Sequence, residues 1–174
     1  LLLGASFKYT MPLVFGRQRY TYKYAWAIPR KAALEAIAKH SPIVEVGAGS
    51  GYWAKLLNDL GADIVAYDSD PNTYHSSGGN ETVAKDHSDR ALLLCWPPYG
   101  AKMATNCLKN YKGDTVLFIG EWDGCTGDAS FFKLLEKNFS REEVIDLPVW
   151  LGLHDALYVF RRKNPAKSKT KQKK

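Results

Sequence analysis

Residues 43–53 read Ile43-Val44-Glu45-Val46-Gly47-Ala48-Gly49-Ser50-Gly51-Tyr52-Trp53. A short apolar run rich in β-branched residues carries one acid, three glycines follow at alternate positions, and a segment with helical periodicity comes next. This order predicts a buried strand that turns sharply into a helix, with glycine where the backbone must bend tightly and let a ligand approach. The first turn of such a helix offers unpaired N–H groups to a polar or anionic ligand. The alternative is a glycine-rich turn that binds nothing.

The glycine spacing narrows the choice of ligand. A dinucleotide fingerprint reads G-x-G-x-x-G, whereas here the third glycine, Gly51, comes one residue early. With Glu45 two residues before Gly47, the pattern is E-x-G-x-G-x-G. It resembles motif I of the class I S-adenosylmethionine-dependent methyltransferases. The resemblance implies S-adenosyl-L-methionine as the cofactor, with Gly47, Ala48, Gly49 and Gly51 beside its methionine part and Glu45 orienting the loop.

Acids follow the next two predicted strands. Residues 62–67 form a second buried run, and Asp68 follows 17 positions after the last glycine of the motif. A carboxylate there can accept hydrogen bonds from both hydroxyls of a ribose, although an acid that opens a turn is also common. A short strand over 82–85 would end at Asp86 and His87, which are counted with the cofactor-binding strand ends. The resemblance implies a contact of Asp86 with adenine; the alternative for Asp86 is a surface turn.

The fourth predicted strand, over 91–96, ends in a further motif. Cys95-Trp96-Pro97-Pro98-Tyr99 resembles the Asp/Asn-Pro-Pro-Tyr/Phe motif of methyltransferases acting on exocyclic amino groups of bases or on amide nitrogens. In that family the acid or amide accepts hydrogen bonds from the target NH₂, but Trp96 replaces it and cannot accept one. Three interpretations stay open: amino-group chemistry, a rigid Pro-Pro turn, or a pocket with Trp96 and Tyr99 as aromatic walls for a planar or cationic substrate. Cys95 is counted with the cofactor-binding strand ends.

A catalytic base is needed only when the nucleophile must lose its proton beforehand. The candidates are His75 in the 69–80 loop, His87, and Glu121 at a strand end; His154 lies further away, and any loop histidine can equally be structural. The predicted catalytic residues are Trp96, Tyr99, His75 and Glu121.

Helices and strands alternate through the middle of the chain. Strands buried on both faces and separated by helices predict an α/β fold: a Rossmann-like, mostly parallel sheet with helices on both faces and a C-terminal antiparallel hairpin strand. The expected helices cover 29–40, 51–60, 101–111 and 129–138, and the remaining strands cover 115–119, 144–150 and 156–161.

The 174 residues, 45% of them apolar, are enough for one domain with a full core. We expect an aromatic and basic segment at 1–28, serving as a substrate cap or packing arm, a methyltransferase-like domain at 29–163, and a disordered basic tail at 164–174. The aromatics of 20–26 alternate strictly, which predicts an extended strand-like segment. Residues 1–40 carry a net charge of +6, residues 41–160 carry −8 and residues 161–174 carry +8.

The basic ends of the chain are compatible with a nucleic acid acceptor. The acidic middle argues against it, so a small-molecule acceptor is an equally good interpretation. No apolar run is long enough for a membrane span, and the first residues lack the basic lead of a signal peptide. Three cysteines without a Cys-x-x-Cys pair predict neither a disulfide framework nor a metal site, and indicate a cytoplasmic setting.

Three functions therefore compete. The first is methyl transfer to an unidentified small molecule or nucleic acid. The second is a catalytically inactive methyltransferase-fold protein that only binds, which the replacement of the usual acceptor by Trp96 supports. The third, a nicotinamide oxidoreductase, is disfavoured by the glycine spacing.

Overall fold

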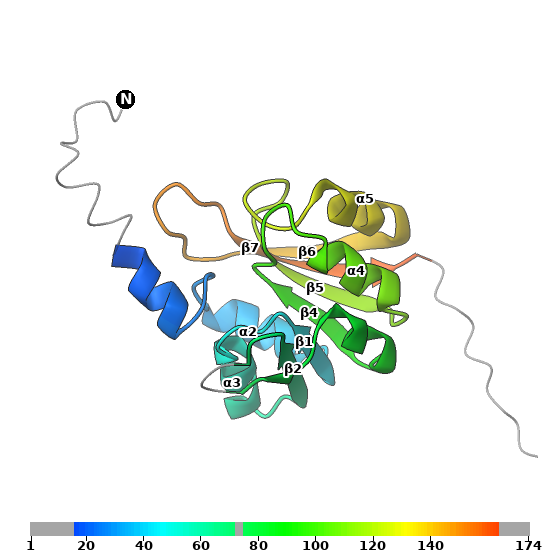
Figure 1. Ribbon diagram of the computed structural model, residues 1–174, viewed down its shortest axis with the longest axis horizontal. Coiled ribbons are helices and arrows are strands. Elements are labelled where there is room, and N and C mark those ends of the chain that lie inside the picture. Colours follow the sequence, from blue (N-terminus) through cyan, green and yellow to red (C-terminus); the bar gives the residue numbers. More distant parts are fainter. Residues whose placement is uncertain (1–15, 72–74, 164–174) are drawn as a thin grey trace, which may run out of the picture.

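The computed structural model describes residues 16–71 and 75–163. Its centre is a seven-stranded sheet in the order β3-β2-β1-β4-β5-β7-β6 (Figure 1). The first five strands run parallel, and β7 pairs antiparallel with both β5 and β6. The strands are β1 (Ile43–Val46), β2 (Ile64–Asp68), β3 (Ser77–Gly78), β4 (Ala91–Cys95), β5 (Thr115–Gly120), β6 (Phe139–Asp146) and β7 (Ala156–Arg162). The predicted fold class, a mostly parallel sheet with a C-terminal antiparallel hairpin, is confirmed.

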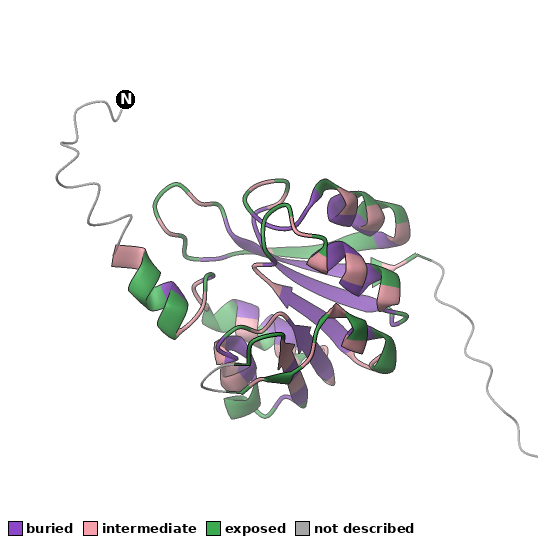
Figure 2. Ribbon diagram, viewed as in Figure 1, coloured by how far each residue is buried: buried purple, intermediate pink, exposed green. Residues whose placement is uncertain are grey.

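Helices cover both faces of the sheet. On one face lie α2 (Lys31–Ala38) and α3 (Tyr52–Asp59). On the other lie α4 (Met103–Asn110), α5 (Ala129–Asn138) and the short 3₁₀ helix η1 (Glu81–Asp86). Because side chains alternate along a strand, Ile43 belongs to the first core and its neighbour Val44 to the second. Figure 2 shows the result: the central strands are buried throughout, and each helix is buried along one side only.

The N-terminal segment differs from the prediction. Residues 16–23 form a helix rather than an extended strand, and it lies to one side of the sheet (Figure 1). In the helix Thr21 is buried, while Tyr22 is 79% exposed. Strict alternation predicts a strand only where a sheet edge is there to pair with, and here the N-terminal helix packs instead against the 147–155 loop, where Tyr20 stacks on Trp150.

Two strand predictions are also wrong. Residues 82–85 lie in η1, because the Asn80 side chain accepts a hydrogen bond from the Thr82 N–H and so begins a helical turn. The strand expected at 144–150 is β6, which starts earlier, directly after α5. As the edge strand it is mostly exposed, so its polar residues gave no hydrophobic signal.

None of the described helices is both long and apolar enough to cross a membrane. The predicted tail at 164–174 and the first fifteen residues of the predicted N-terminal segment lie outside the described residues.

Candidate functional site

A glycine corner joins β1 to α3. Gly47, Gly49 and Gly51 all have positive φ angles, of 76°, 54° and 75°, a conformation that favours glycine. The corner is held from β2, since the Gly47 N–H donates to the Tyr67 carbonyl over 2.8 Å and the Gly49 N–H donates to Asp68 Oδ2 over 2.7 Å. A Cβ on Gly51 would lie 2.7 Å from the backbone nitrogen of His75, whereas one on Gly49 would meet nothing within 4 Å. The corner is therefore packed at Gly51 and open at Gly49.

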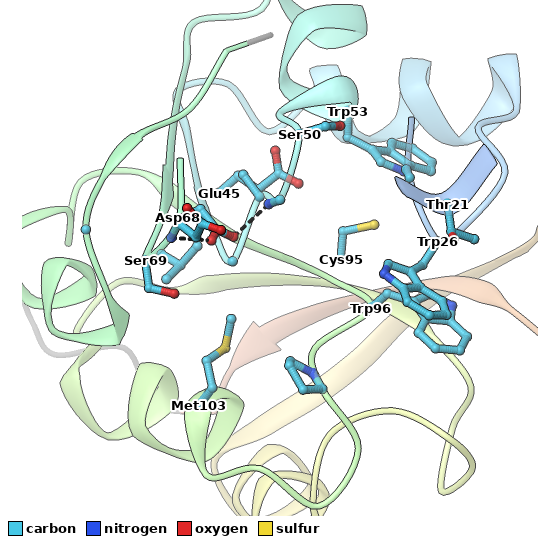
Figure 3. A pocket seen from close by; sticks show the side chains of 18 of the residues that line it. Thr21, Trp26, Glu45, Ser50, Trp53, Asp68, Ser69, Cys95, Trp96 and Met103 are labelled. Carbon is cyan, nitrogen blue, oxygen red and sulfur yellow. Dashed lines mark hydrogen bonds between the residues drawn. The ribbon is translucent and has the colours of Figure 1, made fainter. Parts of the chain in front are cut away.

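The open side faces a cavity of about 530 Å³ at the carboxyl ends of the parallel strands (Figure 3). This volume is typical of a site for a small molecule or cofactor. The N-terminal segment closes one side of it. The lining residues are Thr21, Tyr22, Tyr24, Ala25, Trp26, Glu45, Val46, Gly47, Ala48, Gly49, Ser50, Trp53, Asp68, Ser69, Asp70, Gly79, Asn80, Glu81, Cys95, Trp96, Pro98 and Met103.

The ionisable side chains of the described lining include acids but no bases. Four carboxyl groups line the cavity, and among the described residues no Lys, Arg or His does. Such a surface attracts a cation and repels phosphate groups. The acidic lining comprises Glu45, Asp68, Asp70 and Glu81.

Glu45 is the most deeply buried of these acids. Its side chain is 1% exposed, and within the described structure Oε2 has no hydrogen-bond partner. Burial raises the pKa of Glu45 to about 8; a backbone hydrogen bond from Ala54 opposes that shift, and the charge of Asp68 adds to it. A buried acceptor without a partner is costly, so a ligand that brings a donor or a positive charge to this point would be stabilised.

Asp68 joins the glycine corner to the loop after β2. Besides the Gly49 N–H, its carboxylate accepts the Asp70 N–H over 2.9 Å, and it still lines the cavity. The predicted strand at 82–85 does not exist. The residues that line the cavity after β3 therefore include Asn80 and Glu81, at the beginning of η1. Sequence reasoning missed both, although the turn signal Gly79-Asn80 pointed to that position.

Asp86, predicted to contact adenine, and His87, predicted to bind the cofactor, lie outside the cavity lining. Asp86 is exposed at the end of η1, and His87 Nε2 lies 3.2 Å from Tyr67 Oη. The reason is the same local error: with η1 in place of a strand, these residues no longer follow a strand end.

Trp96 forms the opposite wall of the cavity. It holds a left-handed backbone angle, φ 52°, which is rare for a residue with a bulky side chain. Its N–H donates to the Ile119 carbonyl over 2.8 Å, and its indole Nε1 donates to Asp155 Oδ1 over 2.8 Å. Its ring stacks on Trp26 with centroids 5.1 Å apart and planes 15° apart (Figure 3). Tyr99, predicted as the second aromatic wall, is 76% exposed and outside the lining, so Trp26 takes that place.

Asp155 supports Trp96 from the start of β7. It is 3% exposed, and Oδ2 has no hydrogen-bond partner within the described structure. Burial raises the pKa of Asp155 to about 6, although the hydrogen bond from Trp96 opposes that rise. Sequence reasoning missed Asp155, because an acid in a turn before a strand carries no signal of its own.

The predicted bases lie outside the cavity lining. Glu121 accepts the Cys125 N–H over 3.0 Å and the His154 N–H over 2.8 Å. Burial raises the pKa of Glu121, but these hydrogen bonds lower it more, and the net shift is downward. The Glu121 carboxylate thus holds two loops together, and the His75 side chain is exposed.

Cys95 does line the cavity, at the end of β4. Burial raises the pKa of its thiol well above the ordinary value, and the charges of Glu45 and Asp155 add to the effect. The thiol is therefore neutral and a poor nucleophile. Among residues 16–71 and 75–163, no group of three or more His, Cys, Asp or Glu side chains could hold a metal ion.

No protein-family model matches the chain, and no curated protein matches its sequence. Solved structures do share its fold. With a TM-score of 0.60 and 15% identity, the chain resembles 1,6-didemethyltoxoflavin-N1-methyltransferase from Burkholderia thailandensis, solved with bound 1,6-didemethyltoxoflavin and S-adenosylhomocysteine. The match covers 90% of this chain and 86% of the other.

Two further structures agree. The N-methyltransferase NodS from Bradyrhizobium japonicum, bound to S-adenosylhomocysteine, gives a TM-score of 0.53 at 12% identity over 85% of this chain and 87% of NodS. Magnesium protoporphyrin IX methyltransferase from Synechocystis, with bound S-adenosylmethionine, gives a TM-score of 0.51 at 9% identity. That match covers 92% of this chain and 99% of the other. The chain has the class I methyltransferase fold.

Proposed function

We propose that the protein is an S-adenosylmethionine-dependent methyltransferase with a small-molecule acceptor. The observation that carries the proposal is that the charged side chains lining the described cavity are all acidic, and that this cavity lies beside the open glycine corner. S-adenosylmethionine carries a sulfonium and an ammonium against one carboxylate, so its net charge is positive. A nicotinamide dinucleotide brings a pyrophosphate, which this lining would repel.

The residues present fit this cofactor. Glu45 has an unpartnered buried oxygen for an ammonium donor, and Gly49 leaves room at the corner. Asp68 would accept hydrogen bonds from the ribose hydroxyls, and Asn80 and Glu81 would lie toward the base. When bound, the cofactor supplies an activated methyl group, so positioning of the acceptor carries much of the rate.

The lining also bears on the acceptor. A nucleic acid would have to bring phosphates close to a described lining that has acidic but no basic side chains, which costs electrostatic energy. Arg17, a basic residue of the N-terminal helix, lies against two aromatic rings: its guanidinium carbon is 5.1 Å from the Trp26 ring centroid and 5.7 Å from the Trp96 ring centroid. We therefore favour a small molecule over RNA or DNA.

Calorimetry with S-adenosylmethionine, S-adenosylhomocysteine and NAD tests the cofactor. We expect both adenosyl compounds to bind and NAD not to bind. Gly49→Arg should weaken binding by about 100-fold or more, equivalent to roughly 2.7 kcal/mol, because its side chain would enter the cavity. Gly61→Arg is the matched control: Gly61 also has positive φ and open space around it, but it does not line the cavity.

Folded wild-type protein that binds neither adenosyl compound would refute the proposal. Tritiated-methyl labelling of fractionated cell extract then separates an active enzyme from a protein that only binds the cofactor. Labelled small molecules are expected, and label confined to nucleic acid would contradict the choice of acceptor.

A further inference from the structure

The Trp26–Trp96 pair has features that cofactor binding alone does not require. Both rings line the cavity, and they stack at 15° to one another. Trp26 remains 46% exposed, although tryptophan side chains are on average largely buried. A half-exposed flat surface at the edge of a cavity is typical of a place where a second planar group binds.

The pair is held in position at three points. Trp96 keeps a strained left-handed backbone angle, φ 52°, and its indole N–H is bonded to Asp155. The Trp26 carbonyl accepts a hydrogen bond from Trp150 Nε1 over 3.1 Å. Strain that the surrounding structure maintains is a reason to look for function, and fixed walls reduce the entropy lost on binding.

The electrostatics of the pair favour positive charge. Asp155 lies behind Trp96, and its carboxylate accepts from the indole N–H, which leaves more electron density on the ring. The face of an electron-rich indole attracts cations. The chain already places one planar cation there, since the Arg17 guanidinium lies within 6 Å of both ring centroids.

We propose that Trp26 and Trp96 form the acceptor subsite, and that its ligand is a neutral planar nitrogen heterocycle that becomes cationic when a ring nitrogen is methylated. This inference rests on the proposed function. The acceptor nitrogen uses its lone pair to form the bond to the methyl carbon, while the carbon–sulfur pair stays on sulfur, so positive charge passes from sulfur to nitrogen. No His or Lys lines the described cavity. A ring nitrogen of this kind has no proton to lose, so its methylation needs no base.

Asp155 is then a positioning residue. It contacts Trp96 but does not itself line the cavity, and it acts by orienting the indole and by adding negative charge behind it. As positive charge grows on the acceptor, the aromatic pair would stabilise it more than it stabilises the neutral substrate, which is the condition for lowering a barrier.

Three probes with one ring skeleton test the subsite on protein saturated with S-adenosylhomocysteine. They are isoquinoline, the permanently charged N-methylisoquinolinium, and the equally charged but saturated N,N-dimethyldecahydroisoquinolinium. Quenching of tryptophan fluorescence and calorimetry give the affinities. We expect N-methylisoquinolinium to bind most tightly, and the saturated cation to bind about tenfold more weakly because it cannot stack.

Variants assign the effect to residues. Trp26→Leu should weaken N-methylisoquinolinium binding about tenfold, and Trp26→Phe should restore most of the loss. Tyr99→Leu, the same kind of change at an exposed aromatic outside the lining, should leave affinity unchanged. Asp155→Asn keeps an acceptor for the indole but removes the charge, so the preference for the cation over isoquinoline should fall about threefold. A purely structural role for Asp155 would not change that ratio.

The outcomes are distinguishable. Absence of S-adenosylhomocysteine binding would refute the proposed function, and with it this inference. Normal S-adenosylhomocysteine binding, with equal affinity for the flat and saturated cations or equal losses in Trp26→Leu and Tyr99→Leu, would overturn the inference alone.

Discussion

The half of the cavity beside β1 and β2 and the half beside β4 and β7 are built in different ways. In the first, Gly49 and the carboxylate that holds it, Asp68, are only 19 positions apart. In the second, Trp96 is bonded to Asp155, 59 positions away, and it stacks on Trp26 from the N-terminal segment. The first half is one local strand-turn-helix-strand unit, whereas the second depends on contacts that only the complete fold provides. Substitutions in the two halves should therefore have different effects.

The largest loss of stability at a single pH is expected from Gly51→Val in the local half. The new side chain would start 2.7 Å from the His75 backbone at a φ of +75°, and we expect a loss of about 3 kcal/mol in the free energy of unfolding. Gly49→Ala is the control, because its Cβ meets nothing within 4 Å, and about 1 kcal/mol is expected from its backbone strain. Urea unfolding measures both, and equal losses would show that the corner is not packed as described.

Glu45→Gln should alter the pH dependence of stability. The folded pKa of Glu45 is raised from 4.5 to about 8, so the native state holds this proton more tightly than the unfolded chain does. Stability from this group is full below about pH 4.5 and is lost as pH rises to about 8, a change on the order of 5 kcal/mol. Unfolding of the ligand-free protein between pH 5 and 8 should show a flatter curve for the variant. Parallel curves for the variant and the wild type would contradict the burial of this acid.

Asp155→Asn tests the distant half in the same way, with a smaller effect. Here the pKa rises from 3.8 to about 6, so the stability from this group is full below about pH 3.8 and is lost by about pH 6, at most about 3 kcal/mol. Between pH 6 and 8 the variant should follow the wild-type slope, whereas Glu45→Gln should not. A variant of Asp155 that differs in slope above pH 6 would mean that the two acids titrate together.

The smallest effect is expected from Trp150→Phe. The change keeps a ring that can stack on Tyr20 and removes the hydrogen bond to the Trp26 carbonyl, so global stability should fall by less than about 1 kcal/mol. Tryptic cleavage at Lys23 should become faster. Unchanged cleavage would show that this bond does not hold the N-terminal segment.

The same contrast decides how much the sequence could predict. Glycine at three alternate positions and an acid at the end of the next strand are local patterns, and the structure brings Gly49 and Asp68 together as such a unit. The sheet was also predictable, because the interior strands are apolar on both faces. The role of each site residue stays a prediction.

What the sequence could not show depends on distant contacts. The alternating aromatics of 20–26 fit a strand equally well, but residues 16–23 form a helix in which Tyr20 packs on Trp150. Asp155 looks like any turn acid until β7 places it under Trp96. The prediction of Tyr99 as an aromatic wall was reasonable from its motif, but the chain turns that side chain into solvent.

A side-chain hydrogen bond joins the glycine corner to the N-terminal segment. The Ser50 hydroxyl, within the glycine corner, donates to the carbonyl of Tyr24, two residues before Trp26. We therefore expect occupation of the corner and the ordering of the aromatic wall to be thermodynamically linked. Linkage of this kind is reciprocal: whatever factor the nucleoside adds to acceptor affinity, the acceptor returns to the nucleoside, and a Ser50→Ala protein should bind each as if the other were absent.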